Sequence, residues 1–162
     1  MTIVGILILI ATFLVMEGIT WFTHKYVMHG FLWYLHADHH EPKYPHVFEK
    51  NDLFFVIFAI PSITLIYYGF NAEGFDVRMW IGFGIMAYGA AYFFVHDIFI
   101  HQRFKIFKNT DSAYFKGLRK GHKVHHKHLG KEDGECFGML WVPMKYFKEA
   151  AKSKAKNKRV NA

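Results

Sequence analysis

Three long apolar stretches, separated by polar segments, dominate the pattern along the chain. They cover residues 3–22, 53–70 and 79–95, and Glu17 is the only acidic or basic residue within them. Each stretch is about as long as a helix must be to cross a hydrocarbon layer of ~30 Å. The pattern predicts an all-α integral membrane protein with three to four transmembrane helices. The fourth would be a shallow segment at residues 138–147, which we interpret as an interfacial piece.

Two polar segments predict helices that carry histidines outside the spans. In HADHH, His36, His39 and His40 share one face, because residues three and four apart are neighbours on a helix. Residues 111–130 show an amphipathic pattern, and Asp111 is the expected N-cap. The histidines of this second segment fall on its apolar face, toward the body of the protein. Together the two segments predict a histidine-rich helical cap beside the membrane.

Basic residues are distributed unevenly around the predicted spans, and the net charge is +7. Nothing basic precedes the first span, and the connection 71–78 carries Arg78 alone. In contrast, residues 25–50 carry three Lys and residues 101–162 carry sixteen Lys or Arg. Because basic loops stay in the cytoplasm, we expect an inner-membrane protein whose N-terminus is outside and whose histidines and C-terminus are cytoplasmic. This topology explains the positive charge without a nucleic-acid partner.

The composition changes near the C-terminus. The tail KSKAKNKRVNA, residues 152–162, is rich in lysine and predicts disorder. We therefore expect one domain at residues 1–151. The single cysteine, Cys136, rules out a disulfide bond within the chain.

Histidine is the most unusual feature of the composition, with twelve in 162 residues. Ten of them form two kinds of motif, each present twice, with the spacing His-x4-His or His-x2-His-His. A separation of five places two rings ~140° apart on an ideal α-helix, which suits either a bend or two ions on opposite sides of the helix. The ten motif histidines are the predicted metal ligands: His24, His29, His36, His39, His40, His96, His101, His122, His125 and His126.

The number of imidazoles predicts the number of metal ions. A zinc ion takes about four protein ligands, so ten histidines are too many for one ion and fit two ions with about five each. Imidazole suits zinc, copper, iron and nickel, so the spacing alone does not name the metal. The alternative is a set of hydrogen-bonded core histidines, which the repetition of both motifs at one membrane face disfavours.

Other polar residues near the motifs carry weaker signals. Asp97 and Asp38 are candidates to accept a hydrogen bond from the second ring nitrogen of a ligand, although exposure to solvent is an equal alternative for Asp38. Glu17 lies within the first span, where it either faces a substrate path or pairs with a polar group on another helix. His46 and His128 lie outside the motifs, and we interpret them as surface or hydrogen-bonding residues.

The set of ten histidines resembles that of the membrane-bound fatty acid hydroxylase and sterol desaturase superfamily. The flanking sequence is similar to the bacterial β-carotene 3-hydroxylases in the segments HKYVMHG, HHEP, FEKNDL, HDIFIHQRF and GKEDGECFGMLW. The resemblance covers nearly the whole chain apart from the lysine-rich tail. It implies a monooxygenase with two non-haem iron ions that uses dioxygen to convert β-carotene through β-cryptoxanthin to zeaxanthin. It also implies an external, ferredoxin-type electron donor.

Alternatives remain within and outside this superfamily. The histidine set is equally expected in a fatty acid or sterol hydroxylase, a desaturase, or a carotenoid ketolase that acts at the neighbouring ring carbon. A membrane metal transporter is the alternative from another class of protein, but its ligands should lie near the middle of the bilayer. A haem protein needs only one or two axial ligands, which leaves most of the ten histidines unexplained.

Overall fold

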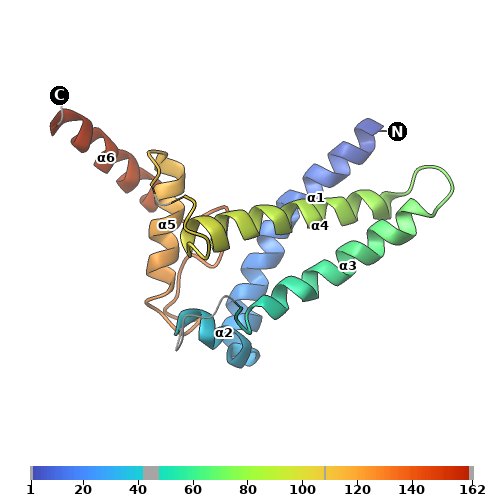
Figure 1. The fold of residues 1–162 in the computed structure, drawn as a ribbon, viewed down its shortest axis with the longest axis horizontal. Helices are drawn as coiled ribbons and strands as arrows, with labels where there is room; N and C mark the ends of the chain where they lie inside the picture. Colours follow the sequence, from blue (N-terminus) through green and yellow to red (C-terminus); the bar gives the residue numbers. More distant parts are fainter. Residues whose placement is uncertain (1, 42–47, 108, 161–162) are drawn as a thin grey trace.

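The computed structural model describes residues 2–41, 48–107 and 109–160, with side chains up to Ser153 (Figure 1). All regular elements in these ranges are helical, which confirms the predicted all-α class. Three helical stretches are long and apolar enough to cross a membrane: Thr2–Phe31, Asp52–Phe70 and Val77–Ile100. Within the described part of the chain no fourth stretch qualifies, and residues 138–143 are not helical.

The helices α1 (Thr2–Phe22), α3 (Asp52–Phe70) and α4 (Val77–Tyr92) form the membrane part of the fold, and α4 packs on both of the others. Two glycines on α4 allow this close packing. A Cβ atom on Gly82 would lie 2.8 Å from a carbonyl oxygen of α3, and one on Gly84 would lie 2.8 Å from a carbonyl oxygen of α1. The C-terminal end of α4 leads toward α5, whereas the end of α1 and the start of α3 lie near α2 (Figure 1).

Two of the spans change their winding at the ends that carry histidines. After α1 the chain continues as a π-helix, η1 (Thr23–Phe31), and after α4 as a second π-helix, η2 (Phe93–Ile100). A π-helix is held by hydrogen bonds between residues five apart, and the His101 N–H donates to the His96 carbonyl at 2.9 Å. The two rings of each His-x4-His motif therefore lie on one side of their helix. The alternative of two ions on opposite sides of the helix is wrong.

The polar helices lie beyond these π-helices. The short helix α2 (Trp33–His40) follows η1 after a break at Gly30, and α5 (Ala113–His125) packs on α6 (Met144–Val160). The predicted N-cap Asp111 is wrong, because α5 begins two residues later, after an extended Ser112, and the exposed Asp111 carboxylate pairs with Lys116. The helix α6 continues to Val160, where the composition predicts disorder from residue 152.

Candidate metal centre

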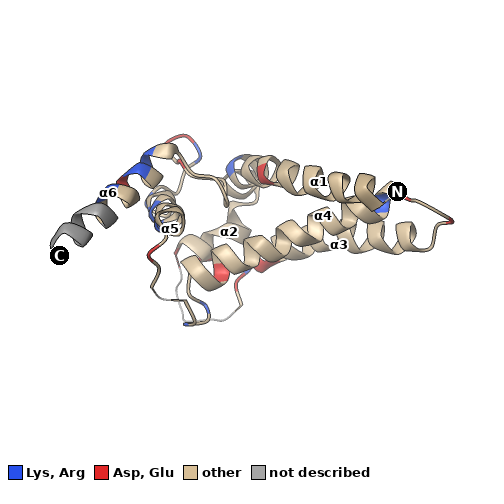
Figure 2. Cartoon of the chain, turned by 90° about the horizontal axis from the view of Figure 1, so that it is seen from above, with Lys and Arg blue, Asp and Glu red and all other residues tan. Residues whose placement is uncertain are grey.

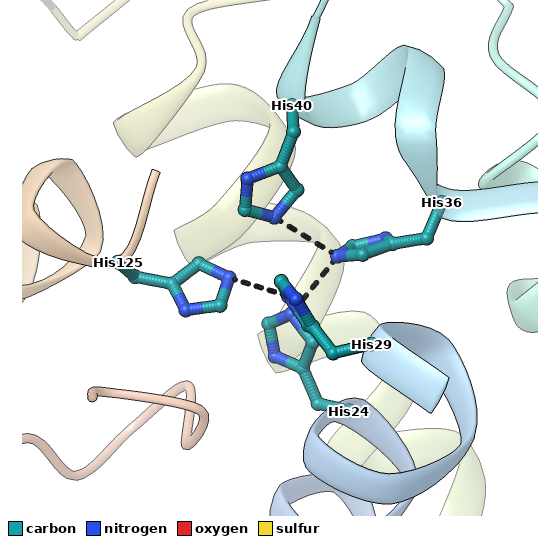
Figure 3. Close-up of side chains that lie close together, drawn as sticks. All are labelled: His24, His29, His36, His40 and His125. Carbon is teal, nitrogen blue, oxygen red and sulfur yellow. Dashed lines mark hydrogen bonds between the residues drawn. The ribbon is translucent and has the colours of Figure 1, made fainter. Parts of the chain in front are cut away.

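The motif histidines from four separate segments converge at the end of the spans. Nine of them form two groups in which one ring nitrogen from each residue lies within 4.8 Å of the others. The five-histidine group (Figure 3) and the four-histidine group adjoin each other, because the rings of His39 and His36 stack at 5.3 Å. The five-histidine group contains His24, His29, His36, His40 and His125. The four-histidine group contains His39, His96, His101 and His122.

In the five-histidine group the Nε2 atoms point toward a common centre. The Nε2 atom of His36 lies 3.1 Å from that of His24 and 3.1 Å from that of His40, and the Nε2 atoms of His29 and His125 are 3.2 Å apart. Nitrogen ligands of a single ion are about 3 Å from one another when each metal–nitrogen bond is ~2.1 Å. This close approach of Nε2 atoms therefore fits a shared cation.

The outward Nδ1 atoms of this group donate to neutral carbonyl oxygens. Because an oxygen can only accept, each Nδ1 carries the proton and each Nε2 keeps its lone pair for a metal. The buried Nδ1 of His40 is the exception, since it has no partner within the described residues. The acceptors are Phe137 O for His24 at 2.9 Å, Leu129 O for His29 at 2.8 Å, Asn51 Oδ1 for His36 at 2.7 Å and Glu135 O for His125 at 3.2 Å.

The four-histidine group has the same inward geometry but a different outer layer. Its Nε2 atoms approach in two pairs, His96 with His39 at 3.0 Å and His101 with His122 at 2.7 Å. Two of its Nδ1 atoms face carboxylates, His39 toward Glu49 at 2.8 Å and His96 toward Asp97 at 3.3 Å. A carboxylate partner makes the imidazole a stronger donor to a metal. The two groups therefore differ in the charge next to their Nδ1 atoms: neutral carbonyl oxygens in the first group and carboxylates in the second.

The tenth motif residue, His126, lies between the two groups. Its Nε2 atom is 2.9 Å from that of His122, and its ring stacks on His40 at 4.3 Å with an interplanar angle of 19°. It thus contacts members of both groups. The structure gives five and four nitrogens that surround two centres, plus one histidine that links them.

Burial keeps these imidazoles neutral at pH 7. Removal from water lowers the pKa of His36 and of His101 to about 3 and that of His126 to about 4. Burial, followed by repulsion from neighbouring histidines, places the pKa of His39 and of His122 well below its ordinary value. A neutral ring has a free lone pair, so the centre is prepared to bind metal without releasing many protons. An all-imidazole set of this kind fits iron as well as zinc or copper.

One guanidinium organises the carboxylates around the four-histidine group. Arg103 lies 2.9 Å from Asp97, 3.0 Å from Glu49 and 2.8 Å from Asp52. Burial raises the pKa of Glu49, and the guanidinium opposes that increase. Glu49, Asn51, Asp52 and Arg103 lie within the motif segments FEKNDL and HDIFIHQRF, but the spacing of histidines gave no reason to assign them a role.

The other polar residues singled out in the sequence fall in several places. Asp97 faces His96, the adjacent residue, and Asp38 accepts a hydrogen bond from the backbone N–H of Lys50 at 2.7 Å. His128 is half-buried and belongs to neither group, whereas His46 lies outside the described residues.

An apolar cavity of about 570 Å³ lies between α1 and α3 beneath α4. Its wall is mostly aliphatic and aromatic, and two of its residues on α3, Phe55 and Val56, are also exposed on the surface. At its inner end lie Asn51, Tyr92 and Asp97, each in contact with a metal-site histidine. The cavity is therefore separated from these histidines by a single layer of side chains.

Comparisons with known proteins agree with this arrangement. The model of the family described as Fatty acid hydroxylase matches residues 9–146. A beta-carotene hydroxylase of Pantoea ananas is 44% identical over 137 residues, which cover 85% of this chain and 77% of that protein. A beta-carotene hydroxylase of Paracoccus sp. (strain PC1) is 38% identical over 138 residues, which cover 85% and 83%. The chloroplastic beta-carotene hydroxylase 1 of Capsicum annuum is 37% identical over 122 residues, 74% of this chain and 38% of that protein. No solved structure matches the chain.

Proposed function

The chain belongs to the fatty acid hydroxylase family, and from this premise we propose that it converts β-carotene through β-cryptoxanthin to zeaxanthin at a centre of two iron ions. The observation that carries the proposal is the pair of histidine groups beside an apolar cavity between the membrane-spanning helices. The bacterial relatives, which match along most of their own length, bear the name beta-carotene hydroxylase. Their identity with this chain supports a carotenoid as the substrate.

The chemistry requires a metal centre because the target carbon–hydrogen bond is unactivated. Bound iron would supply the activation of dioxygen, which acid–base side chains cannot provide. One oxygen atom enters the product and the other leaves as water, so each hydroxylation consumes two electrons and two protons. The ten motif histidines would hold the ions, and their outer partners fix the ring orientation. The apolar cavity would bind the hydrocarbon and exclude water from the reacting carbon.

The position of the site suits a substrate in the bilayer and an electron donor in the cytoplasm. We place the histidine end of the spans on the cytoplasmic face of the inner membrane, with the N-terminus outside. Lys and Arg gather near α5 and α6, while α3 and most of α4 carry few charges (Figure 2). Exposed Lys123 and Lys127 lie beside the metal-site histidines of α5. Such a surface favours an acidic donor of the ferredoxin type.

Two alternatives are weakened by the geometry. A metal transporter should hold its ions near the middle of the bilayer, whereas His24 and His96 lie toward one end of their membrane-spanning stretches. A carotenoid ketolase or a lipid hydroxylase would share the metal centre, so only the product distinguishes these enzymes from a carotenoid 3-hydroxylase.

The decisive experiment is expression of the full chain in bacterial cells that accumulate β-carotene, with pigments separated by chromatography. We expect β-cryptoxanthin and then zeaxanthin, and loss of both products in a variant that lacks His39. An iron chelator should stop the reaction in membranes, and ferrous iron but not zinc should restore it. Unchanged β-carotene despite verified expression and iron supply would contradict the proposal, and a keto product would favour the ketolase.

A further inference from the structure

The carboxylate of Glu17 lies inside the first span and binds a distant loop. Its Oε1 atom accepts hydrogen bonds from the backbone N–H groups of Met139, Leu140 and Trp141 at 2.9, 3.0 and 2.9 Å. Its Oε2 atom accepts one from the hydroxyl of Tyr88 at 2.6 Å. A single side chain of α1 therefore gathers three successive N–H donors of the loop that precedes α6.

A carboxylate is the side chain that suits this position. An ionised group within a membrane span is costly unless it is well hydrogen-bonded, and a carboxylate offers about four acceptor sites and no donor. Glutamine at position 17 would keep one carbonyl oxygen for the three backbone donors, but it would lose the charge that strengthens these hydrogen bonds and would turn an NH2 group toward the Leu140 N–H and the Tyr88 hydroxyl that now donate to Oε2. The contact is also close, because a Cβ atom on Gly138 would lie 2.7 Å from Glu17 Oε1. Glycine at position 138 lets the loop reach the carboxylate.

The loop that Glu17 holds also carries the acceptors for two metal-site histidines. The carbonyl of Phe137 accepts from His24 Nδ1 at 2.9 Å, and that of Glu135 accepts from His125 Nδ1 at 3.2 Å. His24 lies seven residues after Glu17, in η1, the π-helix that continues α1. The first membrane-spanning stretch thus contacts the loop twice, once through the carboxylate of α1 and once through the imidazole of η1.

We propose that Glu17 is a positioning residue for the five-histidine group. By fixing residues 139–141 it holds the preceding carbonyls where they orient the rings of His24 and His125. In the four-histidine group the outer partners of His39 and His96 are the carboxylates of Glu49 and Asp97, which lie outside this loop. The inference rests on the proposed metal centre but not on the identity of the organic substrate.

The test is metal titration of the purified full chain in detergent micelles, with Co2+ followed by absorption and by metal analysis. The wild-type protein is expected to bind two ions. In Glu17→Gln we expect one site to weaken about 10-fold or more, the usual effect of losing an outer partner of a metal-binding histidine. The other site should keep its affinity. Gly138→Ala, which crowds the same contact, should produce the same selective loss and serves if Glu17→Gln does not fold.

Two further variants make the result specific. Tyr88→Phe removes one donor from the same carboxylate but leaves the loop bound, so both affinities should stay within about 3-fold of wild type. Glu49→Gln should weaken the opposite site. Equal loss of both ions in Glu17→Gln and Gly138→Ala, or two wild-type affinities in both, overturns the inference, as does a wild-type protein that binds fewer than two ions. If the wild-type protein binds two ions and the variants lose one selectively, but the wild-type protein forms no carotenoid product, the inference stands and the proposed substrate is wrong.

Discussion

Replacement of Arg103 by methionine is expected to destabilise the protein and to weaken metal binding at the four-histidine group alone. The guanidinium contacts Asp97, Glu49 and Asp52, with separations of 2.8–3.0 Å, and its side chain is 13% exposed. Methionine keeps much of the volume but leaves three carboxylates without a cation. Two of them, Glu49 and Asp97, contact the Nδ1 atoms of metal-site histidines.

The magnitude follows from the burial of the partners. Removal of one partner from a buried ion pair costs about 3–5 kcal/mol. Asp52 is 32% exposed and adds little, whereas Glu49 and Asp97 are 19% and 10% exposed and carry most of the cost. We therefore expect a loss near the lower limit, about 3 kcal/mol. Without the guanidinium the pKa of Glu49 rises further, and a protonated carboxyl holds its histidine less well. Metal affinity at this group should fall about 10- to 100-fold.

Two measurements check this expectation: unfolding of the metal-free protein in detergent micelles, and titration with Co2+. Arg103→Lys keeps the charge but not the forked geometry, so it should lie between wild type and Arg103→Met in both. Arg78→Met is the matched control, because that arginine pairs with Asp76 in an exposed turn at the other end of the spans. The reasoning fails if Arg103→Met unfolds like the control, or if both metal sites weaken equally.

Three other predictions concern the cavity, the ligands and pH. At Gly89, which lines the cavity, a Cβ atom would have its nearest contact at 4.0 Å. Gly89→Leu should therefore extend into the cavity and lower turnover of a long hydrocarbon about 10-fold or more without loss of metal, whereas Gly18→Leu on the open side of α1 should behave like wild type. Equal turnover in both variants would show that this cavity is not the substrate site. His39→Ala and His125→Ala should each abolish turnover while the protein still inserts into membranes, and normal activity in either would remove that residue from the metal site. The metal-free protein should become less stable as pH falls below about 6.5, the pKa of a histidine in the unfolded chain. The reason is that His36 has a pKa of about 3 in the folded protein, so the unfolded state binds more protons in this pH range. A melting temperature that does not change between pH 7.5 and 5 would contradict this prediction.

The membrane spans and the histidine centre could be predicted because both leave strong signals in side-chain type. The apolar stretches predict three helices, and the structure has helices at the same places. The first and third continue as π-helices through the two His-x4-His motifs. The convergence of the four motifs followed from charge, since all lie on the same side of the predicted membrane. Nine of the ten predicted ligands are in the two groups, and the tenth, His126, lies beside them.

The winding of the helices and the outer partners could not be predicted. Two histidines five residues apart do not share a face of an α-helix, which has 3.6 residues per turn. No residue type in HKYVMH or HDIFIH predicts a π-helix. The acceptors for His24, His29 and His125 are backbone carbonyls, which every residue possesses, so no residue type marks them. For Glu17 the predicted pairing with a polar group on another helix is confirmed by the Tyr88 hydroxyl, but its backbone N–H partners more than a hundred residues away could not be predicted.

The distribution of ligands shows why neither site can form from one part of the chain. The chain has two halves that share one order of elements: a span, a π-helix with His-x4-His and a segment with His-x2-His-His, while the third span, α3, lies between the two halves. The five-histidine group takes all its members from the first half except His125, and the four-histidine group takes all its members from the second half except His39. Each half thus contributes one histidine to the group of the other half. Metal binding at the proposed sites would therefore require the two halves to be docked, and the free energy of metal binding would stabilise the docked arrangement. Loss of either exchanged residue removes the one histidine that a group receives from the other half, which is why His39 and His125 are the most informative positions to change.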